Sequence, residues 1–514
     1  MCKVNEVFRE IRNFVFMKND MTTHAAGNGA DTICAISTPP GVGGIAVIRV
    51  SGPRAIEISD RVWEGKRLSD TPGHRVRFGK VIDPSHGGEL LDEGVATVFR
   101  APASFTGEDV IELSVHGSRY VQRRLLEILV GQGARLADAG EFTRRAFANG
   151  KMDLAQAEAV ADVIASNSRA AHRLAASQMK GTFSRRLEEL RGKLLDLASL
   201  LELELDFSEE EVEFASRDRL RDIATEIHDE VSRLEQSFSA GSAIKGGIPV
   251  AIIGPTNAGK SSLLNLLLGE DRAIVSDIHG TTRDTIEDTL EIGDYLFRFI
   301  DTAGLRDTTD PIEALGIQRS RQARDRAAIV IQVVDATCHD PEIDATTDSQ
   351  SVDVSPTPTI LLLNKADLMD YGPSDNQRNS LHTPGELTQA APSSIGDTPN
   401  SPNAATKPHH ILTFSAKTGQ GHKELLNLLT TIADTLRGNT DEDTILVTNL
   451  RHAQALREAA HSTAAILDGL SANLPGDLIA QDLRATLHHL STITGTLTTP
   501  DILSSIFSRF CIGK

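Results

Sequence analysis

Aromatic residues and cysteines are scarce in this 514-residue chain, and each shortage excludes a class of protein. Phe, Trp and Tyr make up only 4% of the residues, which argues against a surface that stacks nucleic-acid bases. No apolar run reaches the roughly 18 residues of a membrane-spanning helix, so the sequence predicts no membrane span. The cysteines are too widely scattered for a disulfide framework or a metal-binding spacing, so we expect a cytoplasmic enzyme. They are Cys2, Cys34, Cys338 and Cys511.

Basic residues are also in short supply. There are 52 Lys and Arg against 71 Asp and Glu, which gives a formal net charge of −19. Because contacts between basic side chains and phosphates dominate nucleic-acid affinity, this balance argues against tight, unassisted nucleic-acid binding. With 40% hydrophobic residues the chain can form sizeable cores. Its length predicts about two to four domains.

A glycine-rich loop and a downstream Asn-Lys-x-Asp group are the most informative positive signals. The loop, Gly254-Pro-Thr-Asn-Ala-Gly-Lys-Ser261, fits the spacing G-x-x-x-x-G-K-[ST], in which backbone N–H groups surround phosphate oxygens. Lys260 is expected to reach the terminal phosphates, and the Ser261 hydroxyl to bind magnesium. The carboxylate of Asp367 can accept both the ring N–H and the exocyclic amine of guanine, a pair of donors that adenine lacks. The two groups together predict a GTP-binding protein.

Three further GTPase segments occur in the expected order. Gly280-Thr-Thr-Arg-Asp284 comes first along the chain. Asp301-Thr-Ala-Gly304 then ends an apolar run, and Ser415-Ala-Lys417 follows a second apolar run. One short motif can occur by chance, but five in order make chance negligible. Alternating apolar segments around the motifs predict a parallel α/β sheet with the loops at its carboxyl edge. The predicted strands are 248–253, 295–300, 329–334, 359–363 and 410–414.

The residue after Gly304 bears on the mechanism of hydrolysis. It is Leu305, where Ras-like GTPases place a glutamine that orients the attacking water. An apolar side chain cannot position water, so hydrolysis must use another group. The amide oxygen of Asn257 could hold a monovalent cation that neutralises the developing charge. The nearest charged side chains are Arg306, Asp307, Asp310 and Glu313.

Segments outside these motifs carry a more specific signal. The chain ends in Phe510-Cys-Ile-Gly-Lys514, and three N-terminal segments are also distinctive: 37–52, 104–109 and 140–149. With the strings at 254–265 and 274–284, they resemble the MnmE (also called TrmE) family of tRNA-modifying GTPases, from about Asp31 to the last residue. Related ribosome-assembly GTPases share the phosphate loop but lack both flanking parts. A ribosome-assembly or regulatory GTPase switch without group-transfer chemistry is the alternative.

Pattern and resemblance together predict the domain organisation. The resemblance implies a folate-binding N-terminal α+β domain, an all-α helical domain and an inserted Ras-like P-loop GTPase domain. Leucines at three- and four-residue steps predict helices on both sides of the GTPase. A Pro-, Ser- and Asn-rich stretch predicts a disordered insertion at about 370–408. The predicted parts are an extension (1–30), a folate-binding and dimerisation domain (31–150), helical segments (151–246 and 436–514) and the GTPase domain (247–435).

Residues 1–30 precede the family match. They have mixed charge and lack the apolar core and cleavage site of a signal peptide. Two readings stay open: a functional extension, or a true start at Met17 or Met21.

The resemblance also implies roles for individual residues. Glu313 matches the catalytic glutamate, which acts on the attacking water through an intermediary, and Cys511 lies near the one-carbon site as either a nucleophile or inert packing. Magnesium ligands would be Ser261 and Thr282; potassium ligands would be Asn257, Ser276, Ile278 and Thr281. Folate contacts would be Arg49, Glu112, Lys151 and Lys514. Motifs and resemblance together assign to the nucleotide Asn257, Ala258, Gly259, Lys260, Ser261, Ser262, Ser276, Asp277, Ile278, His279, Gly280, Thr281, Thr282, Asp301, Thr302, Ala303, Gly304, Asn364, Lys365, Ala366, Asp367, Ser415, Ala416 and Lys417.

The activity implied by the resemblance is a potassium-activated, magnesium-dependent GTPase that modifies tRNA. It would form a homodimer and assemble with the FAD-dependent MnmG (GidA) protein into a heterotetramer, and the partner would carry more of the tRNA contact. The pair would add an aminomethyl or carboxymethylaminomethyl group to carbon 5 of the wobble uridine. A tetrahydrofolate such as 5-formyltetrahydrofolate would supply the one-carbon unit. Potassium would promote association of two GTPase domains, which couples hydrolysis to dimerisation.

Overall fold

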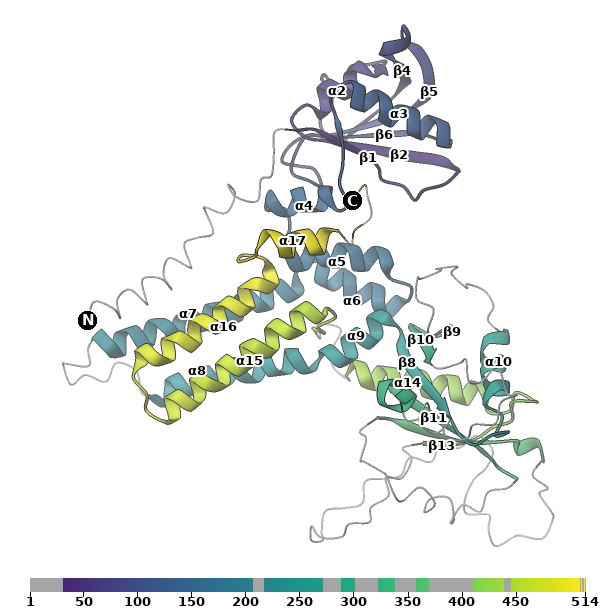
Figure 1. Cartoon of the computed structure of the whole chain (residues 1–514), viewed down its shortest axis with the longest axis vertical. Helices are drawn as coiled ribbons and strands as arrows, with labels where there is room; N and C mark the ends of the chain where they lie inside the picture. The colour runs from purple at the N-terminus through teal and green to yellow at the C-terminus, as the bar shows by residue number, and fades with distance from the viewer. Residues whose placement is uncertain are drawn as a thin grey trace. The chain divides into compact units, whose positions relative to one another are not determined.

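The computed structural model describes residues 31–206, 217–270, 288–300, 322–337, 357–368, 410–438 and 445–508, with Phe510 and Gly513. These residues divide into two compact units (Figure 1). Unit 1 is made of the described residues within 1–165, 175–236 and 450–514, and unit 2 of those within 166–174 and 237–449. Within the described ranges, no helix is long and apolar enough to cross a membrane.

The N-terminal part of unit 1 is a seven-stranded sheet in the order β3-β4-β5-β6-β2-β1-β7, in which only β1 and β7 pair in parallel. Alternate residues of the central strands, such as Ile48 and Val50, pack with α2 and α3 in one core. The strands are β1 (Ile33–Ile36), β2 (Gly43–Ser51), β3 (Trp63–Glu64), β4 (Arg75–Asp83), β5 (Glu89–Phe99), β6 (Val110–Gly117) and β7 (Arg135–Leu136); the helices are α2 (Ala55–Arg61), η3 (Pro84–His86) and α3 (Arg119–Gly131).

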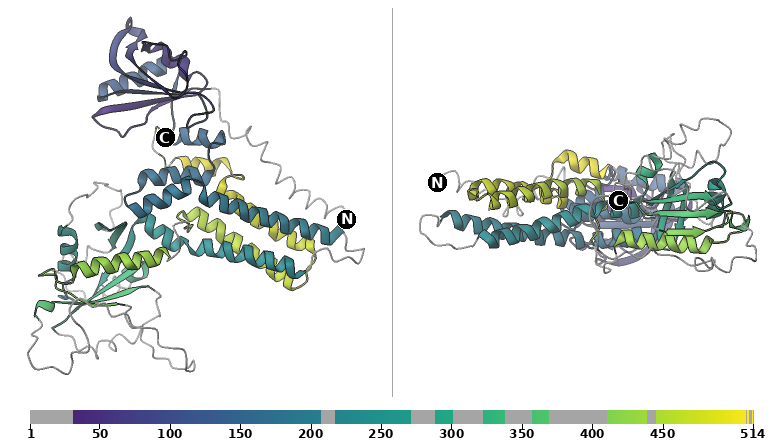
Figure 2. Two further views of the ribbon diagram at one scale, coloured as in Figure 1. Left: turned by 180° about the vertical axis from the view of Figure 1, so that it is seen from behind. Right: turned by 90° about the horizontal axis from the view of Figure 1, so that it is seen from below.

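The helical part of unit 1 is assembled from both sides of the inserted unit 2. Helices α7 and α8 pack against α16 and α15, which lie more than two hundred residues later in the chain. Seen from below, the later pair forms a layer against the earlier pair (Figure 2). The predicted inserted arrangement is therefore confirmed. The helices are α4 (Glu141–Ala148), α5 (Leu154–Ala165), α6 (Arg169–Met179), α7 (Thr182–Asp206), α8 (Arg217–Gln236), α15 (Leu450–Ser471), α16 (Gly476–Thr494) and α17 (Pro500–Phe507).

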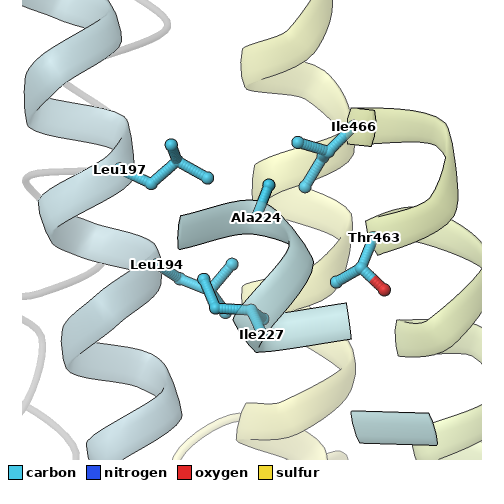
Figure 3. A pocket seen from close by; sticks show the side chains of 6 residues that line it. All are labelled: Leu194, Leu197, Ala224, Ile227, Thr463 and Ile466. Atoms are coloured by element: carbon cyan, nitrogen blue, oxygen red, sulfur yellow. The ribbon is translucent and has the colours of Figure 1, made fainter. Parts of the chain in front are cut away.

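The predicted leucine stripe forms the core of this bundle. Leu187, Leu190, Leu194, Leu197 and Leu201 on α7 are all at most 2% exposed. A small space beside them carries no unpaired polar group: the one hydroxyl lining it accepts a hydrogen bond from His228 Nδ1 and donates one to Ala460 O. We therefore regard this space as core packing and not as a ligand site. Its lining residues are Leu194, Leu197, Ala224, Ile227, Thr463 and Ile466 (Figure 3).

Unit 2 is a six-stranded sheet in the order β13-β12-β11-β8-β10-β9. All five predicted strands are present within one residue of their expected bounds, and they pair in parallel. β9 was not predicted; it is a short, half-polar edge strand antiparallel to β10. The strands are β8 (Ile248–Ile253), β9 (Asp288–Ile292), β10 (Tyr295–Ile300), β11 (Ile329–Asp335), β12 (Thr359–Asn364) and β13 (His410–Thr413); the helices are α9 (Phe238–Gly246), α10 (Lys260–Glu270), η4 (Ala366–Leu368) and α14 (His422–Arg437).

Residues 166–174, from the first helical segment, also lie in unit 2. The backbone N–H of Ala170 donates to Asp294 O in the β9–β10 turn at 2.9 Å. Arg169 and Arg173 form ion pairs with the carboxylate of Asp294, and the side chain of Ala170 joins the core of the sheet. The first half of α6 is therefore bound to the edge of the GTPase sheet.

We predict that Leu194→Ala destabilises the helical bundle. Leu194 is fully buried, and truncation of such a leucine removes transfer free energy and leaves a cavity, at a cost of about 2–5 kcal/mol. Urea unfolding followed by circular dichroism would measure the loss. Ser199→Ala, on the exposed side of the same helix, is the matched control, and equal unfolding midpoints for the two variants would contradict the packing described here.

Candidate functional site

The predicted nucleotide site lies at the carboxyl edge of the unit 2 sheet. Strand β8 ends at Ile253, and the chain turns at Gly254 into the loop that precedes α10. Gly254 has φ of +146°, and a Cβ at this position would lie 2.1 Å from Val333 O. Only glycine fits so close to another backbone. The loop is therefore held directly against β11, the neighbouring strand.

A cation, an amide and a hydroxyl lie close together in sequence on this loop. Lys260 Nζ donates hydrogen bonds to Gly254 O (2.9 Å) and Pro255 O (2.7 Å), and burial lowers the pKa of its ammonium group. Asn257 is exposed and has φ of +64°, a left-handed conformation that asparagine tolerates better than most residues. Ser261 follows Lys260 in the first turn of α10. These are group types that suit phosphate and metal ions.

The side chain of Asn364 joins this loop to the predicted base-binding segments. It is 3% exposed; its Nδ2 donates to Ala258 O at 2.8 Å, and its Oδ1 accepts from the N–H of Ala416 at 3.0 Å. Gly259 provides the necessary space, because a Cβ there would lie 2.0 Å from Asn364 Nδ2. One amide thus uses both of its ends to bring together three segments that are distant in sequence.

Asp367 and Ser415 are in direct contact. Ser415 is fully buried, and its Oγ donates to Asp367 Oδ1 at 2.6 Å while accepting from the N–H of Thr418 at 3.3 Å. The other oxygen, Asp367 Oδ2, has no hydrogen-bond partner among the described residues. The serine therefore fixes the orientation of the carboxylate and leaves one oxygen available. This geometry suits the recognition of guanine predicted from the sequence.

Asp335 was missed by the sequence reasoning. It ends β11, and its Oδ2 forms an ion pair with Lys365 Nζ at 2.5 Å. Thr337 donates to Asp335 Oδ1 from its N–H (3.0 Å) and its hydroxyl (2.7 Å). The pKa of Asp335 is lowered, chiefly by the hydrogen bond from Lys365. The available signal was a carboxylate at the end of a predicted parallel strand, on the edge where ligands bind.

Many predicted site residues lie outside the part of the chain that the structure describes, so their roles stay predictions. The predicted insertion at 370–408 lies outside it too. The residues concerned are Ser276, Asp277, Ile278, His279, Gly280, Thr281, Thr282, Asp301, Thr302, Ala303, Gly304, Glu313, Cys511 and Lys514.

Two of the predicted folate residues form an ion pair in unit 1. Arg49 on β2 and Glu112 on β6 are direct cross-strand partners. Both Nε (2.9 Å) and Nη2 (2.7 Å) of Arg49 donate to a single oxygen, Oε1 of Glu112. The two side chains are partly buried, at 16% and 25% exposure. The pair lies on the sheet face opposite Ile48 and Val50, which pack with α2 and α3.

Lys151 and Gly513 each form a hydrogen bond with the N-terminal part of unit 1. Lys151 Nζ donates to Pro102 O at 2.9 Å, in the loop between β5 and β6. Near the C-terminus, Gly513 O accepts a hydrogen bond from Ser37 Oγ at 3.0 Å, and Ser37 follows directly after β1. Since Ala35 of β1 pairs with Arg49, Gly513 lies at the end of the strand that pairs with the Arg49 strand.

Comparisons with known proteins identify relatives over almost the whole chain. A family model described as MnmE helical domain matches residues 154–511, and one described as GTP-binding protein TrmE N-terminus matches residues 32–151. The tRNA modification GTPase MnmE of Parabacteroides distasonis is 50% identical over 488 residues, covering 94% of this chain and 100% of that protein. The protein of the same name from Cytophaga hutchinsonii is 45% identical, covering 96% of this chain and 100% of that protein.

Solved structures match over less of the chain. A GTP-binding protein from Sulfolobus solfataricus in complex with GDP is 17% identical, with a TM-score of 0.24, and the match covers 48% of this chain and 67% of that one. Era from Aquifex aeolicus is 24% identical, with a TM-score of 0.23, and the match covers 42% and 66%.

We predict that Asp367→Asn changes the base preference from guanine to xanthine. In this variant Ser415 can still donate to the side-chain oxygen, so the new amide N–H₂ would take the place of Asp367 Oδ2. An N–H donor cannot form a hydrogen bond with the N–H groups of guanine, but it can donate to the C2 carbonyl of xanthine. Titration with GTP and XTP would measure the change in base preference. Asp325→Asn, an exposed change of the same kind, should preserve the preference for GTP; a preference for GTP in both variants would contradict the assignment.

Proposed function

The chain belongs to the MnmE family of tRNA modification GTPases, and on this premise we propose that it hydrolyses GTP during a cycle that modifies tRNA. The observation that carries the proposal is the pair of Asn364 contacts, because they join the phosphate loop to the segment after β13, which also contains Ser415. In this site Lys260 binds the terminal phosphates, and Asp367 reads the base with the oxygen that Ser415 leaves available. Asp335 orients Lys365 beside the base.

Two metal ions complete the proposed site. Magnesium would be held by Ser261 and Thr282 and would neutralise phosphate charge; Ser261 suits the role because it directly follows the phosphate-binding lysine in the first turn of α10. Potassium would be held by Asn257 together with Ser276, Ile278 and Thr281. The exposed amide of Asn257 supports this assignment, because its oxygen can reach a cation at the loop surface. Glu313 would act on the attacking water through an intermediary.

The second part of the proposal concerns the Arg49–Glu112 pair. A tetrahydrofolate such as 5-formyltetrahydrofolate has carboxylates that suit cations and a pterin edge with N–H donors that suit a carboxylate. Arg49, Glu112, Lys151 and Lys514 would bind it. Glu112 Oε2, which has no hydrogen-bond partner among the described residues, supports an acceptor role. The tetrahydrofolate would supply the one-carbon unit, with Cys511 near the reacting carbon.

Partners and product complete the proposal. Two copies of the chain would associate through their N-terminal domains and assemble with the FAD-dependent MnmG protein in the cytoplasm. The assembly would add an aminomethyl or carboxymethylaminomethyl group to carbon 5 of the wobble uridine. The net charge of −19 supports a partner that carries much of the tRNA contact, because phosphate binding requires basic groups.

Mass spectrometry of wobble nucleosides tests the proposed product. In cells that lack this protein, we expect the aminomethyl-type groups at carbon 5 to disappear. The wild-type gene should restore them, and a gene carrying Lys260→Ala should not, because phosphate binding is lost. An unchanged nucleoside profile accompanied by a ribosome-assembly defect would instead favour the GTPase switch that lacks group-transfer chemistry.

Exchange of the monovalent cation tests the proposed hydrolysis mechanism. We expect GTP turnover in potassium to exceed that in sodium by at least about tenfold, because the bound cation stabilises charge in the transition state. Asn257→Gly removes the amide and suits the positive φ of +64°, so this variant should bring the ratio of the two rates close to one. Equal turnover of the wild-type protein in the two salts would refute the role of Asn257.

A further inference from the structure

The Arg49–Glu112 pair has an unusual geometry for an arginine and a carboxylate. Such pairs are frequently bidentate, with two parallel N–H groups donating to two different oxygens. Here both donors, Nε and Nη2, use Glu112 Oε1, and Oε2 has no hydrogen-bond partner among the described residues. The guanidinium is therefore offset from the symmetrical arrangement that would occupy both oxygens.

Two aromatic rings lie against the same guanidinium. Arg49 Cζ is 5.4 Å from the centroid of the Phe105 ring and 5.5 Å from that of the Phe142 ring. Both distances are within the range in which the negative face of a ring attracts a cation. Phe142 is fully buried and packs with Ile33 and Ala35 of β1, and Phe105 packs against the same cluster.

The rings come from two segments that one residue ties together. Phe105 lies in the loop between β5 and β6, and Phe142 lies in the first turn of α4. Arg145 donates to Glu108 in that loop (3.1 Å) and to Glu141 in α4 (3.1 Å). The loop is also bound to Asn149, whose Nδ2 donates to Thr106 O at 2.7 Å. The rings therefore have little freedom to move apart.

We propose that Phe105 and Phe142 are positioning residues of the tetrahydrofolate site, an inference that rests on the proposed function. They hold the Arg49 guanidinium so that its two donors engage only Oε1 of Glu112, and Oε2 stays available to accept an N–H group of the ligand ring. Without a ring on one side, the guanidinium can rotate until it occupies both oxygens. The ligand then has to compete with an internal ion pair.

Titration of the full-length protein with 5-formyltetrahydrofolate tests this role. Phe105 is only partly buried, so we use Phe105→Leu, which keeps an apolar side chain but removes the ring face. We expect the dissociation constant to rise about tenfold, the size of a partly desolvated cation–π contact. Phe105→Tyr keeps the ring and should retain wild-type affinity. Phe99→Leu is the matched control, because Phe99 contacts His74 at a ring distance of 5.6 Å and should leave the affinity unchanged.

A double-mutant cycle separates positioning from direct contact or loss of fold. If the ring acts through Arg49, Phe105→Leu should cause no further loss in an Arg49→Ala background. Equal losses in the two backgrounds would overturn the positioning role, and so would wild-type affinity of Phe105→Leu alone. Turnover of GTP, which uses unit 2, should stay unchanged in the control variant Phe99→Leu.

A readout without ligand distinguishes this inference from the proposed function. In the NMR spectrum of the free protein, ring currents should shift the Arg49 Nε–H signal, which Arg49→Ala would identify by its loss. Phe105→Leu should move that signal, and an unmoved signal would overturn the inference. Failure of the wild-type protein to bind 5-formyltetrahydrofolate would instead overturn the proposed ligand, and the positioning role with it, even if the signal moves as expected.

Discussion

One buried amide holds the nucleotide site together. Asn364 ends β12, and its side chain contacts Ala258 in the phosphate loop and Ala416 after β13. Both ends of the amide are used, so loss of the side chain would leave the buried carbonyl of Ala258 unpaired, at about 1–3 kcal/mol, and the partly buried N–H of Ala416 without its partner. Gly259 is required for the same reason, since any side chain there would displace the amide. The spacing of the whole site depends on this contact.

Sequence reasoning predicted the parts of unit 2 that depend on local pattern. Strands with a two-residue period, such as Tyr295–Ile300, were predicted at their observed bounds, and the phosphate loop follows Ile248–Ile253 as expected. β9 was missed because it is a short edge strand with few apolar residues. The packing of residues 166–174 against Asp294 could not be read from sequence, because it joins segments more than a hundred residues apart and depends on one turn.

The candidate sites also contain both kinds of residue: those that local motifs predict and those that only the fold brings together. Lys260, Ser261 and Asp367 were predicted because short motifs have a fixed spacing. Asp335 belongs to no such motif; its role follows from the neighbour relation of β11 and β12, which sequence order does not give. Arg49 and Glu112 were predicted through the family resemblance alone. The rings around Arg49 come from two other segments, and only the folded arrangement brings them together.

The discontinuous helical bundle has a consequence for synthesis of the chain. Helices α7 and α8 are synthesised before residues 237–449, and α15 and α16 only after them. At typical rates of about 5–20 residues per second, that interval lasts roughly 10–40 s. During it, the leucine face of α7 has no C-terminal layer to cover it. A newly made chain therefore exposes the apolar face of α7 to chaperones until α15 and α16 have been made.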